Sequence, residues 1–211
     1  MKKKIARGFY FITDDRLSKN GNMHDVQSAL RAHVSAIQYR NKDGRKDLVL
    51  KEAKALRSLC TETPFIVNDF LDVAIAVDAD GLHIGKTDVC YEKARQALGE
   101  EKIIGVSVHT LEEALRAEAI GADYIGLGPI FRTSTKPDAE RPCGVDLIRR
   151  IKKACSISVV AIGGINLENV QEVISAGADG VCAISATIMQ TDVKKEIDKY
   201  HKLFKIDNLY V

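Results

Sequence analysis

Eight short apolar runs recur along the sequence, and segments of helical spacing separate them. The runs cover residues 9–13, 36–39, 65–67, 82–84, 103–108, 124–131, 159–165 and 181–184. They are near-continuous rather than alternating with polar residues, which is typical of parallel strands covered on both faces. Between them, apolar residues fall on one helical stripe, as at Val49, Ala53, Leu56 and Cys60. The repeated order of strand and helix predicts an α/β fold with a parallel sheet.

Eight strands with intervening helices in 211 residues match the size of one compact (β/α)8 barrel, the TIM barrel. No stretch rich in Pro, Ser or Gly divides the chain, so we expect a single domain over residues 1–211. A doubly wound open sheet is the alternative, because alternation of strands and helices does not prove that the sheet closes. In a barrel, the site belongs at the C-terminal ends of the strands.

The charge balance and the cysteine content exclude several classes of protein. The 31 Lys and Arg residues against 29 Asp and Glu leave a net charge of +2, which predicts no nucleic-acid and no membrane partner. Five cysteines without a CxxC pair favour a reducing compartment. The basic start lacks the long apolar run of a signal peptide, so we expect a soluble, cytoplasmic protein. The apolar residues within 202–211 would cover the barrel base or a partner, so a homo-oligomer stays possible.

Two carboxylates follow neighbouring predicted strands. Strand 64–68 is followed directly by Asp69, strand 81–85 is followed by Asp88, and a helix over about 69–77 joins the two strands. Parallel neighbours end at the same rim, so the two acids would converge there. Mg²⁺ prefers one or two carboxylates together with substrate phosphates. The spacing therefore predicts a magnesium site at Asp69 and Asp88.

Cations and an amide follow the second predicted strand. Strand alternation places Gln38, Arg40 and Lys42 on one side and Tyr39 and Asn41 on the other. Two cations beside an amide suit a polyanion and a polar ring. Taken alone, this stretch would be read as a solvated strand end.

The loop after the sixth strand is long and polar, and such loops in compact domains are often functional. It contains Thr133, Ser134, Thr135 and Lys136, whose hydroxyl and ammonium groups are typical partners of phosphate oxygens. The alternative is a surface loop with incidental polarity.

A second candidate phosphate site follows the last two strands. Gly163 and Gly164 let the backbone come close to a ligand because no Cβ intervenes, and Asn166 is placed to cap the next helix. Loops after strands seven and eight of barrels often bind phosphate through backbone N–H groups. A lone Gly-Gly is usually only a turn, but Ser185 after strand eight supports the phosphate interpretation.

Strand five and its neighbour supply further polar side chains. Ser107 and His109 alternate onto one side and would face the pocket or be satisfied inside the barrel, whereas His83 is interpreted as a supporting interior residue. Thr110 and Glu113 have capping-box spacing, so a helix should begin directly after this strand. Zinc motifs, a nucleophile elbow and a Walker loop are all absent from the sequence. Together, the predicted metal site, the cations and the separate phosphate site suit two phosphorylated ligands, one of which carries a diphosphate to be expelled.

The order and spacing of these segments resemble the thiamine phosphate synthase family from about Tyr10 to Ile188. The matching motifs are Gln38-x-Arg40-x-Lys42, Val67-Asn68-Asp69, Ala79-Asp80-Gly81-x-His83-x-Gly85-x-x-Asp88, Gly105-x-Ser107-x-His109, Gly126-x-Gly128-Pro129-x-Phe131-x-Thr133-x-Thr135-Lys136 and Ala161-Ile-Gly-Gly-Ile165. The resemblance implies that a hydroxymethylpyrimidine diphosphate condenses with a thiazole phosphate to give thiamine phosphate and diphosphate. It also implies a dissociative reaction, in which the thiazole nitrogen captures a pyrimidine methylene cation without a general base.

The resemblance assigns roles to residues of this chain. Mg²⁺ would be held by Asp69 and Asp88. The pyrimidine and its diphosphate would be bound by Gln38, Arg40, Lys42, Asn68, Ser107 and Lys136, of which Arg40, Lys42, Ser107 and Lys136 are the expected catalytic residues. The thiazole phosphate would be bound by Thr133, Thr135, Gly164, Ile184 and Ser185.

Three residues depart from the family pattern, and three other functions compete with the synthase. Asn41, Tyr39 and Lys86 stand where the family usually carries Glu, an aliphatic residue and Gln, and Lys86 would either grip diphosphate or weaken Mg²⁺ binding. The rivals are a thiazole tautomerase of the sister branch, a sugar-phosphate isomerase or epimerase, and a non-catalytic sensor of thiamine precursors. The presence of both Gln38 and Asp88 favours the synthase.

Overall fold

Eight parallel strands form a closed barrel in the computed structural model, which describes residues 5–41, 44–133, 135 and 140–207. The strands are β1 (Gly8–Ile12), β2 (Ala36–Tyr39), β3 (Phe65–Asn68), β4 (Gly81–Ile84), β5 (Ile103–Val108), β6 (Tyr124–Leu127), β7 (Ser158–Ile162) and β8 (Gly180–Cys182). Each strand pairs with the next, and β8 pairs with β1, where Gly180 lies beside Gly8. The predicted TIM barrel is confirmed, and the open-sheet alternative is wrong.

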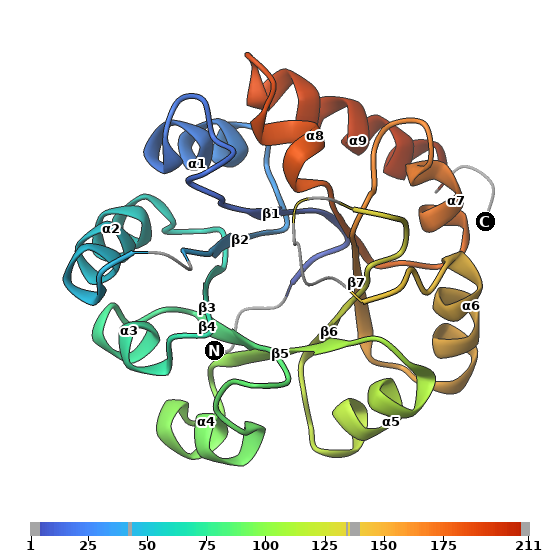
Figure 1. Ribbon diagram of the computed structural model, residues 1–211, viewed down its shortest axis with the longest axis horizontal. Coiled ribbons are helices and arrows are strands. Elements are labelled where there is room, and N and C mark those ends of the chain that lie inside the picture. The colour runs from blue at the N-terminus through green and yellow to red at the C-terminus, as the bar shows by residue number, and fades with distance from the viewer. Residues whose placement is uncertain (1–4, 42–43, 134, 136–139, 208–211) are drawn as a thin grey trace.

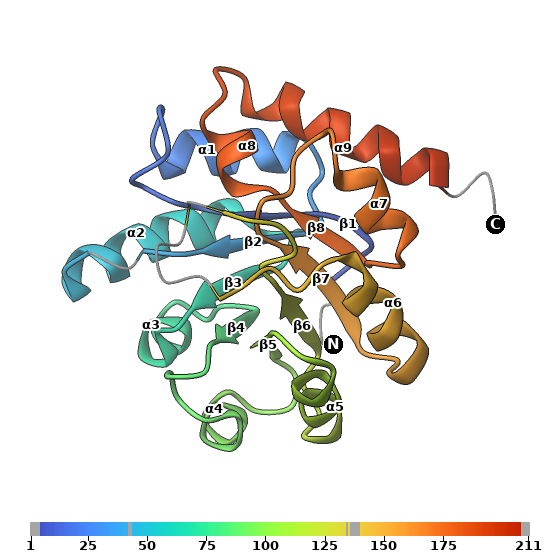
Figure 2. The ribbon, with the colours of Figure 1, turned by 45° about the vertical axis from the view of Figure 1, so that its right-hand side comes forward.

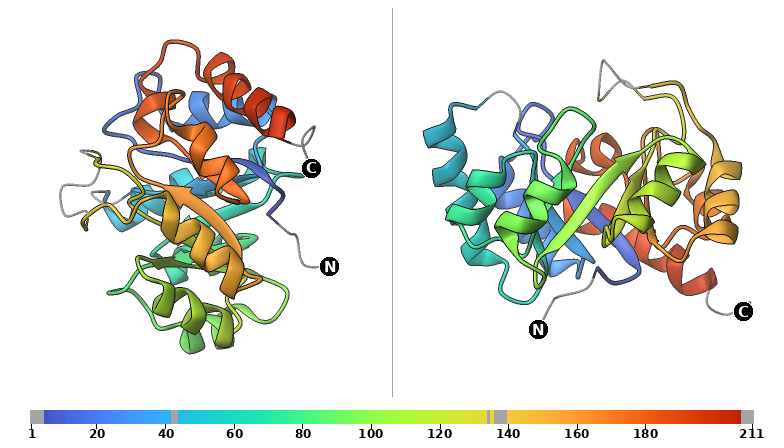
Figure 3. Two further views of the ribbon diagram at one scale, coloured as in Figure 1. Left: turned by 90° about the vertical axis from the view of Figure 1, so that its right-hand side faces the viewer. Right: turned by 90° about the horizontal axis from the view of Figure 1, so that it is seen from below.

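Helices surround the barrel and connect its strands (Figure 1). They are α1 (Asn22–Arg31), α2 (Lys46–Leu59), α3 (Leu71–Ala76), α4 (Tyr91–Leu98), α5 (Leu111–Ala119), α6 (Val145–Ala154), α7 (Val170–Ser175), α8 (Ile184–Ile188) and α9 (Val193–Asp207). The view of Figure 2 shows α9 lying along the outside of the barrel beside α8 and α7, and Figure 3 shows α6 packed beside β7. Among the described residues, no helix combines the length and apolar character that crossing a membrane requires.

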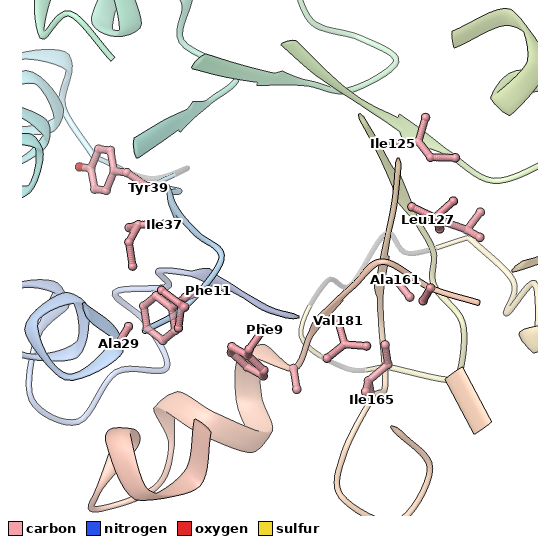
Figure 4. Close-up of a cluster of buried hydrophobic side chains, with 14 of the residues drawn as sticks. Phe9, Phe11, Ala29, Ile37, Tyr39, Ile125, Leu127, Ala161, Ile165 and Val181 are labelled. Carbon is pink, nitrogen blue, oxygen red and sulfur yellow. The ribbon is translucent and has the colours of Figure 1, made fainter. Parts of the chain in front are cut away.

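Strand alternation divides the apolar residues into an outer layer and a barrel interior. The outer layer packs under the helices, as Figure 4 shows for Phe11 of β1 beside Ala29 of α1. The smaller interior cluster contains Tyr10, Ile12, Ala36, Ile66, Ile103, Tyr124, Val160 and Cys182. Each fully buried large side chain stabilises the fold by roughly 1.5–3 kcal/mol relative to an exposed one.

Three of the predicted strands end at least two residues earlier than expected. The predicted run 124–131 ends at Leu127 because Gly128-Pro129 follows, and proline has no N–H to donate to a neighbouring strand. The run 159–165 ends at Ile162, where Gly163 and Gly164 turn the backbone to φ values of 98° and 65°. The run 181–184 ends at Cys182 because Ile184 already opens α8.

The helix starts also test the predictions. The helix predicted from Asp69 begins at Leu71, because Asp69 adopts a left-handed conformation with φ of 65°. The predicted cap of α5 is confirmed: Thr110 Oγ1 accepts a hydrogen bond from Glu113 N at 3.1 Å. Asn166 does not cap α7 itself, since its Oδ1 accepts from Glu168 N and Asn169 N in the turn before the helix.

The C-terminal helix covers one flank of the barrel. Tyr200 of α9 is buried against Phe9 of β1, with ring centroids 5.0 Å apart, and Phe204 is buried near the guanidinium of Arg7. This part of the apolar C-terminal stretch therefore packs on its own barrel. Its last residues, 208–211, lie outside the described residues.

Candidate active site

A cavity of about 390 Å³ opens at the C-terminal ends of the strands. All the predicted site residues that the structure describes line it: Gln38, Arg40, Asn68, Asp69, Asp88, Ser107, Thr133, Thr135, Gly164, Ile184 and Ser185. Lys42 and Lys136, together with Ser134 of the polar loop, lie outside the described residues. Strand ends and loops far apart in the sequence thus converge on one cavity, as a barrel predicts.

Arg40 reaches the cavity from the end of β2 and is held by the end of β1. Its Nη1 lies 2.8 Å from Oδ2 of Asp14, whose side chain is completely buried. Its backbone N–H donates to Thr13 Oγ1 at 3.0 Å. A guanidinium fixed in this way is oriented before an anion arrives, which lowers the entropic cost of binding.

Gln38 and Ser107 are joined by a line of hydrogen bonds through the barrel interior, which we term the interior relay. Gln38 Nε2 donates to Tyr10 Oη at 3.1 Å, and Tyr10 Oη lies 2.8 Å from Tyr124 Oη. His83 joins Tyr124 to Ser107, with Nδ1 2.9 Å from Tyr124 Oη and Nε2 3.0 Å from Ser107 Oγ. Burial lowers the pKa of His83 to about 4, so the imidazole is neutral near pH 7. The expected supporting position of His83 inside the barrel is confirmed.

Asp69 is positioned by an unusual backbone conformation. It leaves β3 with φ of 65°, and its N–H donates to the carbonyl of His83 on β4 at 2.9 Å. A non-glycine residue in this region costs about 1 kcal/mol, although Asp tolerates it better than most residues. Such local strain is concentrated at functional sites.

Asp88 is held by the loop after β4. Its Oδ2 accepts from the N–H of Gly85 at 2.7 Å, which folds the loop back toward the strand end. Asp69 and Asp88 both line the cavity, as predicted for two acids at neighbouring strand ends. In the described part of the chain, no group of three or more His, Cys, Asp or Glu side chains is arranged to hold a metal. Two carboxylates nevertheless fit Mg²⁺, which completes its coordination with water and substrate phosphates.

Lys86 lies between two glutamates at the rim of the cavity. Its Nζ is 3.0 Å from Glu113 Oε1 and 2.8 Å from Glu140 Oε1. These hydrogen bonds, first with Glu140 and then with Glu113, raise the pKa of Lys86. His109 also faces this group, with Nε2 3.6 Å from Glu140, while its Nδ1 is hydrogen-bonded to Gly128 O. The positive charge of Lys86 is therefore matched by carboxylates of its own chain.

The double glycine is required by close packing of the β6 and β7 loops. A Cβ on Gly164 would lie 2.5 Å from Arg132 O, and one on Gly163 would lie 2.5 Å from Pro129 Cβ. Neither distance is tolerated by a real side chain, so only glycine lets these loops meet. The same contact brings Thr133 into the cavity wall, where its Oγ1 accepts from Thr135 N at 3.2 Å.

Comparison with known proteins identifies the family. The model of the family described as thiamine monophosphate synthase matches residues 9–187. The chain belongs to this family. A thiamine-phosphate synthase of Methanosarcina barkeri is 50% identical over 189 residues, which cover 89% of this chain and 86% of the relative. One of Methanosarcina mazei is 48% identical over 193 residues, covering 91% and 80%.

A solved member of the thiamine monophosphate synthase family has the same fold. The thiamine phosphate pyrophosphorylase of Pyrococcus furiosus superposes with a TM-score of 0.86 at 41% identity, covering 94% of this chain and 96% of that one. The resemblance drawn from the motifs is therefore confirmed. Within this family fold, the sequence alone did not reveal the roles of Asp14, Tyr10 and Tyr124. For the tyrosines a signal was present, because strand alternation places both on the inward face.

Proposed function

We propose that this chain is a thiamine phosphate synthase, a transferase that joins a hydroxymethylpyrimidine diphosphate to a thiazole phosphate and releases diphosphate. The observation that carries the proposal is one cavity lined by the guanidinium of Arg40, the carboxylates of Asp69 and Asp88, and the glycine turn at Gly163 and Gly164. This cavity lies in a chain that is 50% identical to a relative named thiamine-phosphate synthase. We also propose that residues 1–211 form one barrel domain that acts in the cytoplasm. Association into a homo-oligomer is compatible with this function.

The diphosphate end of the first substrate would bind at β2, β3 and β4. Arg40 supplies a positive charge that Asp14 already orients, and Lys42 and Lys136 are proposed as additional cations. Asp69 and Asp88 would hold Mg²⁺, which when bound neutralises charge on the diphosphate as it leaves. Arginine suits this position because its planar group pairs well with phosphate oxygens.

The pyrimidine ring would lie deeper, against the interior relay. Gln38 and Asn68 are buried strand residues and Ser107 is half-buried, so their polar groups reach a ring with little competition from water. The parallel register places Asn68 beside His83 and Ser107 beside Gly126, so the ring would be enclosed by residues of several strands.

The thiazole phosphate would bind on the opposite part of the rim, after β6, β7 and β8. Thr133 and Thr135 offer hydroxyl groups, Gly164 allows close backbone approach, and Ile184 and Ser185 lie in the first turn of α8. The first N–H groups of a helix have no partner within the helix and can donate hydrogen bonds to phosphate oxygens.

The reaction needs stabilised charge more than proton transfer. The bond between the pyrimidine methylene carbon and the diphosphate oxygen breaks, and its electron pair leaves with the diphosphate. The thiazole nitrogen then donates its lone pair to the methylene cation, which forms the new carbon–nitrogen bond. No proton moves in either step, so the residues around the cavity serve to orient both substrates and stabilise the leaving charge.

The decisive experiment supplies both precursors with and without Mg²⁺ and measures diphosphate and thiamine phosphate. We expect both products only with Mg²⁺ present. Asp88→Ala should lower turnover by about a hundredfold or more while thiazole phosphate still binds. Asp72→Ala is the matched control, since Asp72 is an exposed acid of α3 outside the cavity.

The same assay separates the rival functions. A tautomerase would convert the thiazole without releasing diphosphate, and a sensor would bind the precursors without turnover. A wild-type protein that binds both precursors but releases no diphosphate would overturn the proposed synthase.

A further inference from the structure

The interior relay connects two residues from opposite parts of the cavity wall. It begins at Gln38 on β2, crosses the barrel through Tyr10, Tyr124 and His83, and ends at Ser107 on β5. Tyr10 and Tyr124 are each 1% exposed, Gln38 is 3% exposed and His83 is 8% exposed. Because water is largely excluded, each polar group of the relay depends on its neighbours for hydrogen bonds.

Each hydroxyl of the relay carries only one proton to donate, so the relay can be ordered in a single direction. Gln38 Nε2 donates to Tyr10 Oη. Either oxygen of the Tyr10–Tyr124 pair can be the donor, and the role of each His83 nitrogen depends on its tautomer. In the ordered arrangement Tyr10 donates to Tyr124, Tyr124 donates to His83 Nδ1, and His83 donates from Nε2 to Ser107 Oγ. The Ser107 hydroxyl then directs its own proton into the cavity.

The two ends of the relay consequently present opposite hydrogen-bonding groups. At β2, Gln38 lines the cavity and uses its amide nitrogen in the relay, so in this arrangement its amide oxygen is the acceptor offered to a ligand. At β5, Ser107 faces the ligand as a donor.

We infer that Tyr10, Tyr124 and His83 are positioning residues that make the site specific for an aminopyrimidine over its oxo analogue. The inference rests on the proposed function, in which Gln38 and Ser107 contact the pyrimidine. An aminopyrimidine donates through its amino group and accepts through a ring nitrogen, which complements an acceptor and a donor. In the oxo analogue a carbonyl acceptor replaces the amino donor, so it meets the amide oxygen of Gln38 unfavourably.

The test removes single hydroxyl groups from the relay. Tyr124→Phe and Tyr10→Phe keep the ring that fills the interior but break the relay at one link. The measurement is kcat/KM for the aminopyrimidine diphosphate divided by kcat/KM for the oxo analogue. We expect this ratio to fall about tenfold in each variant, which corresponds to one hydrogen bond of ordinary strength. The KM for thiazole phosphate should not change.

Tyr39→Phe is the matched control. Tyr39 lies next to Gln38 on β2 but points outward, where its Oη donates to Glu52 Oε2 at 2.7 Å. Removing this hydroxyl also breaks a hydrogen bond of a buried tyrosine, yet it leaves the relay intact. We expect lower thermal stability with an unchanged ratio. If Tyr124→Phe does not fold, Tyr10→Phe decides the question.

Two results with the variants would overturn the inference. The first is a wild-type ratio in both relay variants, and the second is an equal fall of the ratio in Tyr39→Phe. If the wild-type protein does not turn over either compound, the ratio is taken from dissociation constants measured by calorimetry. Failure to bind either pyrimidine would overturn both this inference and the proposed function, whereas normal turnover with an unchanged ratio overturns this inference alone.

Discussion

The guanidinium of Arg40 lies 2.8 Å from the carboxylate of Asp14, and the two residues come from the ends of adjacent strands β2 and β1. The Asp14 side chain is completely buried, whereas that of Arg40 is 13% exposed and lines the cavity. One partner is thus structural and the other is available to a ligand. The pair links the stability of the barrel to the binding of an anion.

Replacing Asp14 should weaken both properties. In Asp14→Asn the buried partner loses its charge, so we expect a stability loss of about 2 kcal/mol and a tenfold lower kcat/KM for the pyrimidine diphosphate. Denaturant unfolding and steady-state kinetics measure the two effects. Asp15→Asn is the control, because Asp15 is the exposed neighbour. Wild-type kinetics in Asp14→Asn would show that Arg40 needs no orienting partner.

Lys86 should tolerate replacement by Gln, the residue that the family usually carries there. Its charge is matched by Glu113 and Glu140, so Lys86→Gln removes ion pairs at an exposed rim rather than a ligand of the substrate. We expect less than a twofold change in KM for the pyrimidine diphosphate and a stability change under about 1 kcal/mol. A tenfold rise in KM would instead place Lys86 on the diphosphate.

Gly164→Ala should lower the free energy of unfolding more than Gly99→Ala does. The new Cβ would lie 2.5 Å from Arg132 O, in addition to the strain of a φ of 65°. Gly99 has a φ of 80°, but no atom lies within 4 Å of the position that a Cβ would take, so Gly99→Ala isolates the backbone strain. We expect a loss of about 1 kcal/mol for Gly99→Ala and about 2–3 kcal/mol for Gly164→Ala. Weaker binding of thiazole phosphate should accompany only the second. Equal losses would contradict the close packing of the two loops.

The stability of the fold should depend on pH through His83. Burial lowers its pKa from 6.5 to about 4, so between these values the unfolded chain binds more protons than the folded one. The free energy of unfolding therefore falls as the pH decreases through this window, by about 3 kcal/mol at its lower end. Carboxylates titrate in the same range, so the test compares wild type with His83→Gln.

The stability difference between these two proteins should shrink from pH 7 to pH 4, as measured by denaturant unfolding with a chelator present. The reason is that only the wild type has an imidazole that must stay uncharged in the folded state. A difference that stays constant with pH would show that His83 is not held neutral by its surroundings.

Strand number and the position of the cavity at the strand ends followed from local sequence patterns, whereas closure was inferred from the number of strands and the size of the chain. Strand alternation correctly placed Gln38 and Tyr39 on opposite faces of β2. Gln38 points inward and joins the interior relay, whereas the Tyr39 hydroxyl donates to Glu52 of α2. The two acids were predicted to meet at the cavity because Asp69 directly follows one short buried strand and Asp88 lies in the loop after the next. These features depend on residues close together in the sequence, where periodicity is informative.

The contacts that were not predicted join residues far apart in the sequence. Tyr10 and Tyr124 are separated by 114 positions, and their hydrogen bond exists only because the sheet closes. Arg40 and Asp14 are likewise brought together by strand pairing. The sequence around Asp14 does not show that this acid is buried or that Arg40 is its partner. The strand ends at Leu127 and Ile162 were missed because apolar residues continue into the loops, where they pack without belonging to the sheet.

The pairing of β1 with β8 has a consequence for biosynthesis. The N–H of Gly8 donates to the carbonyl of Asp179, and Gly8 lies beside Gly180, so β1 finds one of its two neighbours only after β8 has been synthesised. Until then the nascent protein carries an open edge on which strands of other molecules can pair. The yield of folded protein should thus depend on how long β1 waits for β8 during synthesis.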